Sequence, residues 1–555
     1  MRRLGIRGSA GKLGSGAAIL RHTAAALLST GLAGQSRPGH LRDMRRAVRH
    51  TGTSPATLLA VAAAHRPDAL GLVDDRGTLT FGQLNDAAAR LARGLLDRHG
   101  LRPGATIAVL CRNHRGFVLT SAAAGRVGAD VVYLNTEFSG PQLARVWPRL
   151  GADLLVVDEE FLPLVPEGTP RVVAWQDTTA ELTAESTVDP VVEWSTLDGL
   201  VAGHAPLSEV GRLRQGKVTI LTSGTTGAPK GAPRTPSPLA VLGPAVTILR
   251  RTGLRSGDPV LIGPPLFHGF GLAAWALAVF LRSPVVLRRR FDPEVALADI
   301  ERHGIAFVAA VPVMLQRILA LPPAVREGYD HGCLRAVLSG GAALRPVLAE
   351  RFMAEFGDVL YNGYGSSEIG IAAVATPADL RAAPGTVGRP TVGVPARVLG
   401  ADRRPVPAGQ PGTIFVGGPL VFEGYTGGGT KEMVDGLMNT GDVGRIDSEG
   451  RLHVDGRADD MIVSGGENVY PQEVEDVLSR HPAVADVAVI GVDDDEFGQR
   501  LVAYVVARDA PPDPADLALH VKENLARYKV PRAFVFLPEL PRNPTGKLLR
   551  GGLPR

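Results

Sequence analysis

The chain has 555 residues, of which 45% are hydrophobic and 21% are charged, and 60 basic residues face 56 acidic ones. This composition excludes a disordered or fibrous protein and leaves room for two large domains or several smaller ones. The two cysteines, Cys111 and Cys333, are too few for a disulfide framework or a multi-cysteine zinc site, so a reducing compartment fits best.

The N-terminal segment is basic. No acidic residue precedes Asp43, whereas basic residues occur from Arg2 onward. Such a segment is typical of a solvated tail or of a helix lying on a membrane surface, and Arg21 interrupts the apolar stretch that a secretion signal would need. We therefore expect a basic extension over residues 1–52, with weak membrane-surface contact, on a cytoplasmic protein without a transmembrane helix.

From about Thr53, helix-like and strand-like stretches alternate. Residues 80–99 carry apolar side chains at helical spacing, and residues 106–111 read as a short buried strand. Similar buried runs follow at residues 153–157, 218–221, 285–287, 307–311 and 336–338. This alternation predicts an α/β fold with helices covering mainly parallel sheets. Glycine and proline separate short strands over residues 395–424, which indicates a β-rich subdomain.

A domain boundary is predicted near residue 456. Beyond it, residues 471–480 and 516–528 read as helices, and residues 484–489 and 501–506 as strands. These elements would form a small α+β domain of about 100 residues. The expected organisation is an N-terminal extension over residues 1–52, a large domain over residues 53–456 and a small C-terminal domain over residues 457–555.

The most informative stretch follows the strand at residues 218–221 and reads Thr222-Ser-Gly-Thr-Thr-Gly-Ala-Pro-Lys230. Glycines let backbone N–H groups approach phosphate oxygens, hydroxyls donate hydrogen bonds, and a lysine adds charge. Pro229 before Lys230 and Gly231 after it distinguish the stretch from a Walker A loop. Lys230 is also one of only seven lysines in the chain. We expect a polyphosphate to bind at Thr222, Ser223, Gly224, Thr225, Thr226, Gly227 and Lys230.

Six further motifs follow in order: Ser339-Gly-Gly-Ala342, Tyr364-Gly-Ser-Ser-Glu368, Thr440-Gly-Asp442, Gly456-Arg457, Ser464-Gly-Gly-Glu-Asn468 and Asn543-Pro-Thr-Gly-Lys547. With the glycine-rich loop, they resemble the adenylate-forming superfamily, which includes acyl-CoA synthetases, luciferases and peptide-synthetase adenylation domains. The similarity extends from about Thr53 to Arg550. It implies a large N-terminal domain that binds ATP and a mobile C-terminal domain.

The resemblance implies roles for the residues around the nucleotide. Glu368 would hold Mg²⁺ against the triphosphate and take part in catalysis. Asp442, which we expect in a Thr-Gly-Asp turn, would accept hydrogen bonds from the ribose hydroxyls. Tyr364 would stack on the adenine ring. Ser367 stands where threonine is usual in the family, which preserves the hydroxyl. The remaining ATP-binding residues implied by these motifs are Ser339, Gly340, Gly341, Ala342, Gly365, Ser366, Ser367 and Arg457.

The resemblance also implies a reaction in two steps. A carboxylate attacks the α-phosphorus of ATP to give an acyl-adenylate and pyrophosphate, and a thiol then releases AMP. Lys547 would be the main catalytic residue, because its charge stabilises the five-coordinate phosphorus and orients the carboxylate without a proton transfer. The C-terminal domain would rotate about Asp459 between the steps. Coenzyme A would then bind near Ser464, Gly465, Gly466 and Lys529.

One stretch bears on the class of substrate: Pro264-Pro-Leu-Phe-His-Gly-Phe-Gly-Leu272 resembles a family motif beside the acyl pocket. His268 would line or gate its entrance and assist catalysis. Apolar residues follow the motif, and no early aspartate is present to pair with an amino group, so we expect a fatty acid first and an aromatic acid next. The expected activity is fatty acid–CoA ligation with ATP, Mg²⁺ and coenzyme A.

The sequence also bears on three other functions. A fatty acyl-AMP ligase that loads a carrier protein is the alternative, although no extra insertion is evident over residues 442–475. A non-catalytic nucleotide sensor would be expected to lack Lys547 or Glu368, and both are present. A nucleic-acid partner is disfavoured, because basic residues do not cluster with aromatic ones.

Overall fold

The computed structural model describes residues 22–32, 38–177, 195–208, 214–222, 230–234, 238–418, 421, 431–464, 467–494, 498–544 and 546–554. The chain divides into two units. Unit 1 comprises residues 1–309, 321–336 and 422–430, and unit 2 comprises residues 310–320, 337–421 and 431–555. This division groups residues 431–555 with residues 337–421, and the boundary predicted near residue 456 stays a prediction.

The first sheet of unit 1 is parallel except at one edge. Its strand order is β7-β6-β5-β3-β4-β8-β9, and only β9 is antiparallel to its neighbour. The strands are β7 (Ser195–Thr196), β6 (Arg171–Trp175), β5 (Leu154–Asp158), β3 (Thr106–Leu110), β4 (Asp130–Tyr133), β8 (Val218–Thr222) and β9 (Lys230–Arg234). Such strands end together, so loops at their carboxyl ends become neighbours.

Unit 1 contains a second group of strands, in the order β2-β1-β11-β10-β12. They are β2 (Gly77–Thr80), β1 (Leu70–Asp74), β11 (Val285–Leu287), β10 (Val260–Ile262) and β12 (Phe307–Ala310). Only β2 and β1 pair in the antiparallel direction. The predicted buried runs at residues 285–287 and 307–311 are therefore confirmed as strands.

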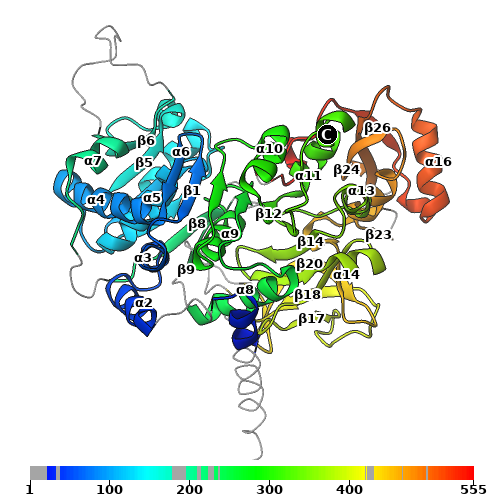
Figure 1. Cartoon of the computed structure of the whole chain (residues 1–555). Helices are drawn as coiled ribbons and strands as arrows, with labels where there is room; N and C mark the ends of the chain where they lie inside the picture. The colour runs from blue at the N-terminus through cyan, green and yellow to red at the C-terminus, as the bar shows by residue number, and fades with distance from the viewer. Residues whose placement is uncertain are drawn as a thin grey trace, which may run out of the picture. The chain divides into compact units, whose positions relative to one another are not determined.

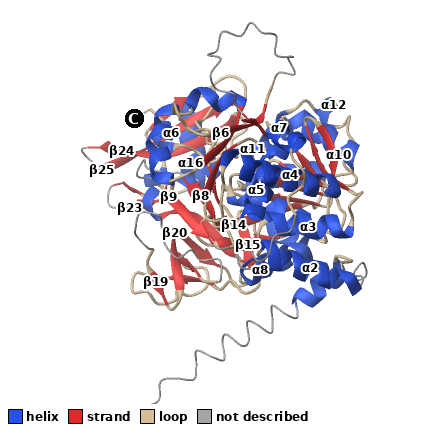
Figure 2. Cartoon of the chain, turned by 90° about the vertical axis from the view of Figure 1, so that its left-hand side faces the viewer, coloured by secondary structure: helices blue, strands red, loops and turns tan. Residues whose placement is uncertain are grey.

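Besides a helical segment over residues 22–29, unit 1 contains ten labelled α-helices among its described residues, and Figure 2 shows α2 to α5 gathered as neighbours. They are α2 (Pro38–Thr51), α3 (Pro55–His65), α4 (Phe81–His99), α5 (Arg115–Val127), α6 (Gly140–Leu150), α7 (Leu197–Gly203), α8 (Pro238–Thr252), α9 (Gly269–Phe280), α10 (Pro293–His303) and α12 (Pro323–Arg326). The sequence dictates the ends of α4. Thr80 and Gln83 cap each other's backbone N–H, and Gly100 ends the helix at φ +62°.

Unit 2 begins with a mostly antiparallel group of strands in the order β17-β18-β20-β21-β16-β15-β14-β13. They are β17 (Ala396–Leu399), β18 (Gly412–Val416), β20 (Leu437–Ile446), β21 (Leu452–Arg457), β16 (Thr386–Pro390), β15 (Gly370–Ala375), β14 (Leu360–Ser366) and β13 (Ala336–Ser339), with β19 (Met433–Val434) beside β20. The helices are α11 (Pro312–Ala320), α13 (Pro346–Phe356) and α14 (Pro377–Ala382). This group contains the β-rich subdomain that the sequence predicts.

The C-terminal part of unit 2, orange to red in Figure 1, has its own sheet. The order is β23 (Glu467–Val469), β22 (Ile462–Ser464), β25 (Gly498–Ala507) and β24 (Val484–Asp494), with β26 (Ala533–Phe536) parallel to β25. Helices α15 (Pro471–Leu478) and α16 (Pro514–Asn524) pack together, and their buried Val474, Leu478 and Leu517 join the core of this sheet. The predicted mixed α/β fold is confirmed in both units.

Two predicted elements differ from the observed ones. Helix α16 begins at Pro514, because Asp513 accepts a hydrogen bond from Ala515 N at 2.9 Å and proline is tolerated in a first helical turn. It ends at Asn524 rather than at residue 528. Strand β24 is longer than predicted and contains a bulge between Val484 and Asp486. Within the described ranges, no helix is long and apolar enough to span a membrane.

Candidate functional site

The predicted phosphate loop lies between two paired strands. Strands β8 and β9 are antiparallel, and Thr222 is the backbone partner of Lys230. The two ends of the motif therefore meet across a hairpin. Ser223, Gly224, Thr225, Thr226 and Gly227 lie outside the described residues. Their binding of phosphate stays a prediction.

Asp442 is the centre of a polar cluster in unit 2. The sequence predicts a turn at this residue, but the structure places it within strand β20, directly opposite Arg457 on β21. Tyr364 Oη donates to Asp442 Oδ2 at 2.5 Å, and Arg457 Nη1 donates to Asp442 Oδ1 at 3.3 Å. The structure thus brings together three residues from three separate motifs.

The environment of Asp442 is partly desolvated, since its side chain is only 14% exposed. Burial raises the pKa of Asp442, and the hydrogen bond from Tyr364 and the charges of Arg457, Lys431 and Lys547 oppose that rise. Burial and the neighbouring carboxylate also raise the pKa of Tyr364 well above its usual value. Tyr364 therefore remains a protonated donor to Asp442.

Lys431 is a further cation near Asp442, and the motifs do not include it. Its Nζ donates to the Thr440 carbonyl at 2.8 Å, two residues from Asp442. It is one of only seven lysines in a chain that otherwise uses arginine, and this scarcity was the signal available in the sequence.

The glycine-rich segment after β13 and the Lys547 loop both lie next to Val311. A Cβ on Gly341 would lie 3.5 Å from Val311 Cγ1, and one on Gly546 would lie 3.4 Å from Val311 Cγ2 and 2.8 Å from Val313 Cγ1. Gly341 has φ +82° and Gly546 has φ +74°, so the backbone favours glycine at both positions, and at Gly546 the close contact with Val313 favours it as well. Ser339 is fully buried, and its hydroxyl has no hydrogen-bond partner among the described residues. Gly340 and Ala342 continue this segment as predicted.

Glu368 lies in the turn between β14 and β15. Ser366 Oγ donates to Glu368 Oε2 at 2.7 Å and holds the carboxylate in place. Gly365 sits at a register shift between the strands, where a Cβ would lie 2.0 Å from the Gly370 carbonyl oxygen. A single carboxylate suits Mg²⁺, which keeps several waters and phosphate oxygens as its other ligands. The metal role of Glu368 and the nucleotide role of the adjoining Ser367 stay predictions.

Lys547 is exposed on a tight loop that closes on itself. Asn543 Oδ1 accepts from Lys547 N at 2.8 Å, and the Lys547 carbonyl accepts from Asn543 N at 2.9 Å. Gly546 N donates to the Asn543 carbonyl at 2.8 Å. These bonds fix the backbone of Lys547 while leaving its side chain exposed.

The predicted hinge and coenzyme A residues are spread along the C-terminal part. Asp459 is 76% exposed in a short 3-10 helix, Ala458–Asp460, and lies 3.5 Å from Arg457. Ser464 is buried at the end of β22, and Gly465 and Gly466 lie outside the described residues. Lys529 Nζ is paired with Glu473 at 2.5 Å. The geometry leaves the roles of these residues as predictions.

His268 caps α9 in unit 1, at the end of a loop held by Asn113. Asn113 Nδ2 donates to the Pro264 carbonyl at 2.9 Å, and its Oδ1 accepts from Leu266 N at 2.7 Å. A Cβ on Gly271 would lie 2.3 Å from the Pro265 carbonyl oxygen, so the turn into α9 requires glycine. Sequence analysis missed Asn113, because nothing in the sequence links residues about 150 positions apart.

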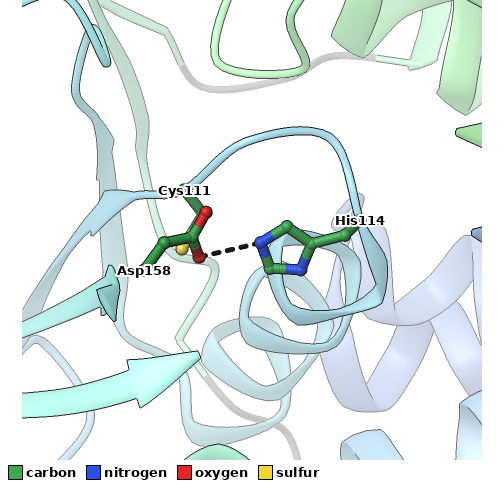
Figure 3. Close-up of side chains that lie close together, drawn as sticks. All are labelled: Cys111, His114 and Asp158. Carbon is green, nitrogen blue, oxygen red and sulfur yellow. Dashed lines mark hydrogen bonds and ion pairs between the residues drawn. The ribbon is translucent and has the colours of Figure 1, made fainter. Parts of the chain in front are cut away.

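A second polar cluster lies at the carboxyl ends of β3 and β5: Cys111, His114 and Asp158 (Figure 3). All three are at most 1% exposed, and their ligand atoms lie within 4.8 Å of one another, as in a metal site. His114 Nδ1 accepts from Gly116 N at 3.0 Å, from which we infer that the ring proton is on Nε2, 2.8 Å from Asp158 Oδ1.

A metal would need the lone pair of that same Nε2 atom. Burial also raises the pKa of Cys111 and disfavours the thiolate that a metal binds. Asp158 Oδ2 is already bonded to Arg112 N at 2.9 Å. The cluster is therefore a closed hydrogen-bonded part of the core.

Comparison with known proteins agrees with the motifs. The AMP-binding enzyme family matches residues 59–426, and the AMP-binding enzyme C-terminal domain matches residues 473–547. A feruloyl-CoA synthase from Amycolatopsis is 35% identical over 86% of this chain and 94% of its own length. A sulfoacetate–CoA ligase from Cupriavidus necator is 34% identical over 89% of this chain and 96% of its own length.

A solved structure gives the same result. An o-succinylbenzoate CoA synthetase from Bacillus subtilis, in complex with its acyl-adenylate intermediate, has a TM-score of 0.74 and 30% identity, and the match covers 89% of this chain and 97% of that one. Together with the ordered motifs and the cluster around Asp442, these matches show that the chain belongs to the AMP-binding enzyme family of adenylate-forming enzymes.

Proposed function

We propose that this protein is an AMP-forming CoA ligase that activates an aromatic carboxylic acid as its acyl-adenylate. One observation carries the proposal: the largely buried Asp442 carboxylate binds both Tyr364 and Arg457, so that three of the motifs that resemble the ATP site meet in one cluster. Lys547, on its own closed loop, would supply the charge for the α-phosphate.

Each residue has a distinct task in this proposal. Asp442 would accept hydrogen bonds from the ribose, and Tyr364, which donates a hydrogen bond to Asp442, would stack on the adenine ring. Lys547 directs its ammonium at the α-phosphate and the attacking carboxylate, where fixed charge stabilises the transition state more than the ground state. Glu368 would hold Mg²⁺, which neutralises phosphate charge when bound. Thr222 to Gly227 and Lys230 would bind the β- and γ-phosphates.

An aromatic acid is proposed in preference to the fatty acid expected from the sequence. Feruloyl and succinylbenzoyl groups, named for two of the three relatives described above, both contain a benzene ring. The structure adds that Trp275, within the apolar stretch after His268, is only 3% exposed and belongs to the core. That stretch therefore offers less free apolar surface than its sequence indicates.

Coenzyme A is the proposed acyl acceptor, because all three of these relatives are named as CoA ligases or synthetases. Ser464, Gly465, Gly466 and Lys529 would bind it, with Asp459 as the hinge and His268 at the entrance for the acid. Lys529 must first release Glu473, its partner in this structure.

AMP release by the purified protein tests the proposal. The assay contains ATP and Mg²⁺, with and without coenzyme A, and hydroxycinnamic, aryl-acetic, fatty or sulfonated acids. AMP formation that needs both an aromatic acid and coenzyme A supports the proposal. A preference for fatty acids would overturn the aromatic assignment. Pyrophosphate release without any response to coenzyme A would indicate a ligase that loads a carrier protein.

We also propose weak contact of the N-terminal region with an anionic membrane surface, on a cytoplasmic enzyme. Residues 22–29 are helical with Leu28 72% exposed, and α2 exposes Met44 and Val48 among arginines. Basic residues flanking apolar ones are typical of interfacial helices. Co-sedimentation of the protein with phosphatidylserine vesicles that weakens as salt is added supports this contact. Equal amounts of protein sedimenting with neutral vesicles would contradict an attraction between the basic residues and anionic lipid.

A further inference from the structure

Asp486 joins two arginines that lie far apart in the sequence. Arg345 Nη1 is 2.9 Å from Asp486 Oδ1, and Arg542 Nη2 is 2.7 Å from Asp486 Oδ2. The three side chains are 12% to 22% exposed, so water screens these pairs only partly. Each carboxylate oxygen serves a different guanidinium, which makes Asp486 a bridge between the two arginines.

The two arginines lie next to the proposed chemistry. Arg345 immediately precedes α13 and follows the Ser339–Ala342 segment by three residues. Arg542 begins the loop that carries Lys547, and its Nη1 donates to the Gly546 carbonyl at 2.9 Å. Because that loop is closed by the Asn543 hydrogen bonds, the position of Arg542 determines the position of the Lys547 backbone.

The backbone around Asp486 is shaped for this bridge. The bulge in β24 lies between Val484 and Asp486, and bulges turn side chains away from the regular strand direction. The Ala485 carbonyl at the bulge accepts a hydrogen bond from Gln316 Nε2 of α11 at 3.1 Å. Arg345 donates in addition to the Val487 carbonyl. Three consecutive residues of β24 thus bind side chains from residues 316–345.

We propose that Asp486 is a positioning residue for adenylate formation. It holds Arg542, and through it the Lys547 loop, against the segments that carry Arg345 and Val313. Asp486 itself does not touch substrate, so it is not a catalytic residue. This inference rests on the proposed role of Lys547, which acts in acyl-adenylate formation and not in transfer to the thiol.

The proposal predicts a selective effect on one half-reaction. Asp486→Asn leaves two guanidinium groups facing a neutral amide, and their repulsion loosens the loop. Misplacement of a reacting group by about 1 Å costs on the order of a hundredfold in rate. We expect Asp486→Asn to lower single-turnover pyrophosphate release by about ten- to a hundredfold, while transfer from supplied acyl-adenylate to coenzyme A changes less than about threefold.

A double-mutant cycle with Lys547→Ala makes the test sharper. If Asp486 acts only through Lys547, Asp486→Asn causes no further loss of pyrophosphate release in the Lys547→Ala background. Asp486→Glu keeps the charge and should restore most of the rate. The matched control is Asp358→Asn, which removes another arginine-paired carboxylate of unit 2, on the exposed surface opposite Arg381, and should leave both half-reactions unchanged.

Three outcomes would overturn the inference: equal loss in both half-reactions, additivity with Lys547→Ala, or no loss at all. A thermal unfolding transition for each variant separates misfolding from misplacement, and Arg345→Gln provides a second route to the same loosened loop. If Lys547→Ala itself leaves pyrophosphate release intact, the proposed function of Lys547 fails first, and the positioning role falls with it.

Discussion

Asp158 and Asp442 are both shielded carboxylates, but their partners differ. Asp158 is completely buried and accepts hydrogen bonds from Arg112 N and His114 Nε2, which lie 46 and 44 residues away. Asp442 keeps 14% of its side chain exposed and bonds Tyr364 and Arg457 from separate motifs, 78 and 15 residues away. A fully buried carboxylate whose two oxygens bind a backbone N–H and a buried imidazole stabilises the fold, whereas one that stays partly exposed between side chains of two motifs is suited to a ligand.

The largest effect is expected from Asp158→Asn. The amide replaces one acceptor oxygen by an NH₂ group that must face Arg112 N or His114 Nε2, both donors. We expect the free energy of unfolding to fall by about 2–4 kcal/mol, as for other buried ionic or hydrogen-bonded partners that are lost. Urea unfolding measures this loss, with Asp358→Asn as the exposed control. Loss of activity in folded protein at unchanged stability would contradict the structural role of Asp158.

Asp442→Asn should show the opposite pattern. Without a full carboxylate for the ribose, kcat/KM for ATP should fall by about tenfold or more, near 1.4 kcal/mol of transition-state binding. Because burial raises the pKa of Asp442, its ionised form is unfavourable in the folded state, and relief of that cost offsets part of the lost hydrogen bond from Arg457; we expect a smaller loss of stability than for Asp158→Asn. Initial rates over a range of ATP concentrations, with urea unfolding, test both parts. A stability loss as large as that of Asp158→Asn would remove the distinction.

Asp476 gives the smallest effect and refines the comparison. Burial raises the pKa of the Asp476 carboxyl to about 6. The charge of Glu475 raises this pKa further, and the charges of Arg345 and Arg480 oppose the rise. The protonated carboxyl of Asp476 contributes fully to the free energy of unfolding at pH values below the pKa of aspartate in the unfolded chain. This contribution is lost as the pH rises through 6 and the carboxyl ionises in the folded protein. Asp476→Asn should therefore gain about 1–2 kcal/mol at pH 8 and nothing near pH 4. Equal gains at both pH values would show that ionisation is not the cause.

The sequence predicted the elements better than the contacts. The buried strands ending at Leu110, Asp158 and Ser339 follow from apolar runs, and the glycine motifs mark places where the backbone must turn or approach closely. Asp442 was expected in a turn, because the Thr-Gly-Asp motif resembles one, but pairing with β21 overrides that local tendency.

The Arg345–Asp486–Arg542 bridge could not be predicted. Its members are separated by 141 and 56 residues, and their meeting depends on one bulged residue in β24. Periodicity does not locate a bulge, and ion pairs of this kind follow from sheet register rather than from composition. Asn113 follows strand β3 and holds the loop before His268, and its role could not be predicted for the same reason.

The position of Val311 next to both Gly341 and Gly546 has a consequence for enzyme engineering. A larger side chain at residue 311 would press on the Ser339–Ala342 segment and on the loop of Lys547 at the same time. Two segments that lie more than 200 residues apart in the sequence would therefore respond together to one substitution.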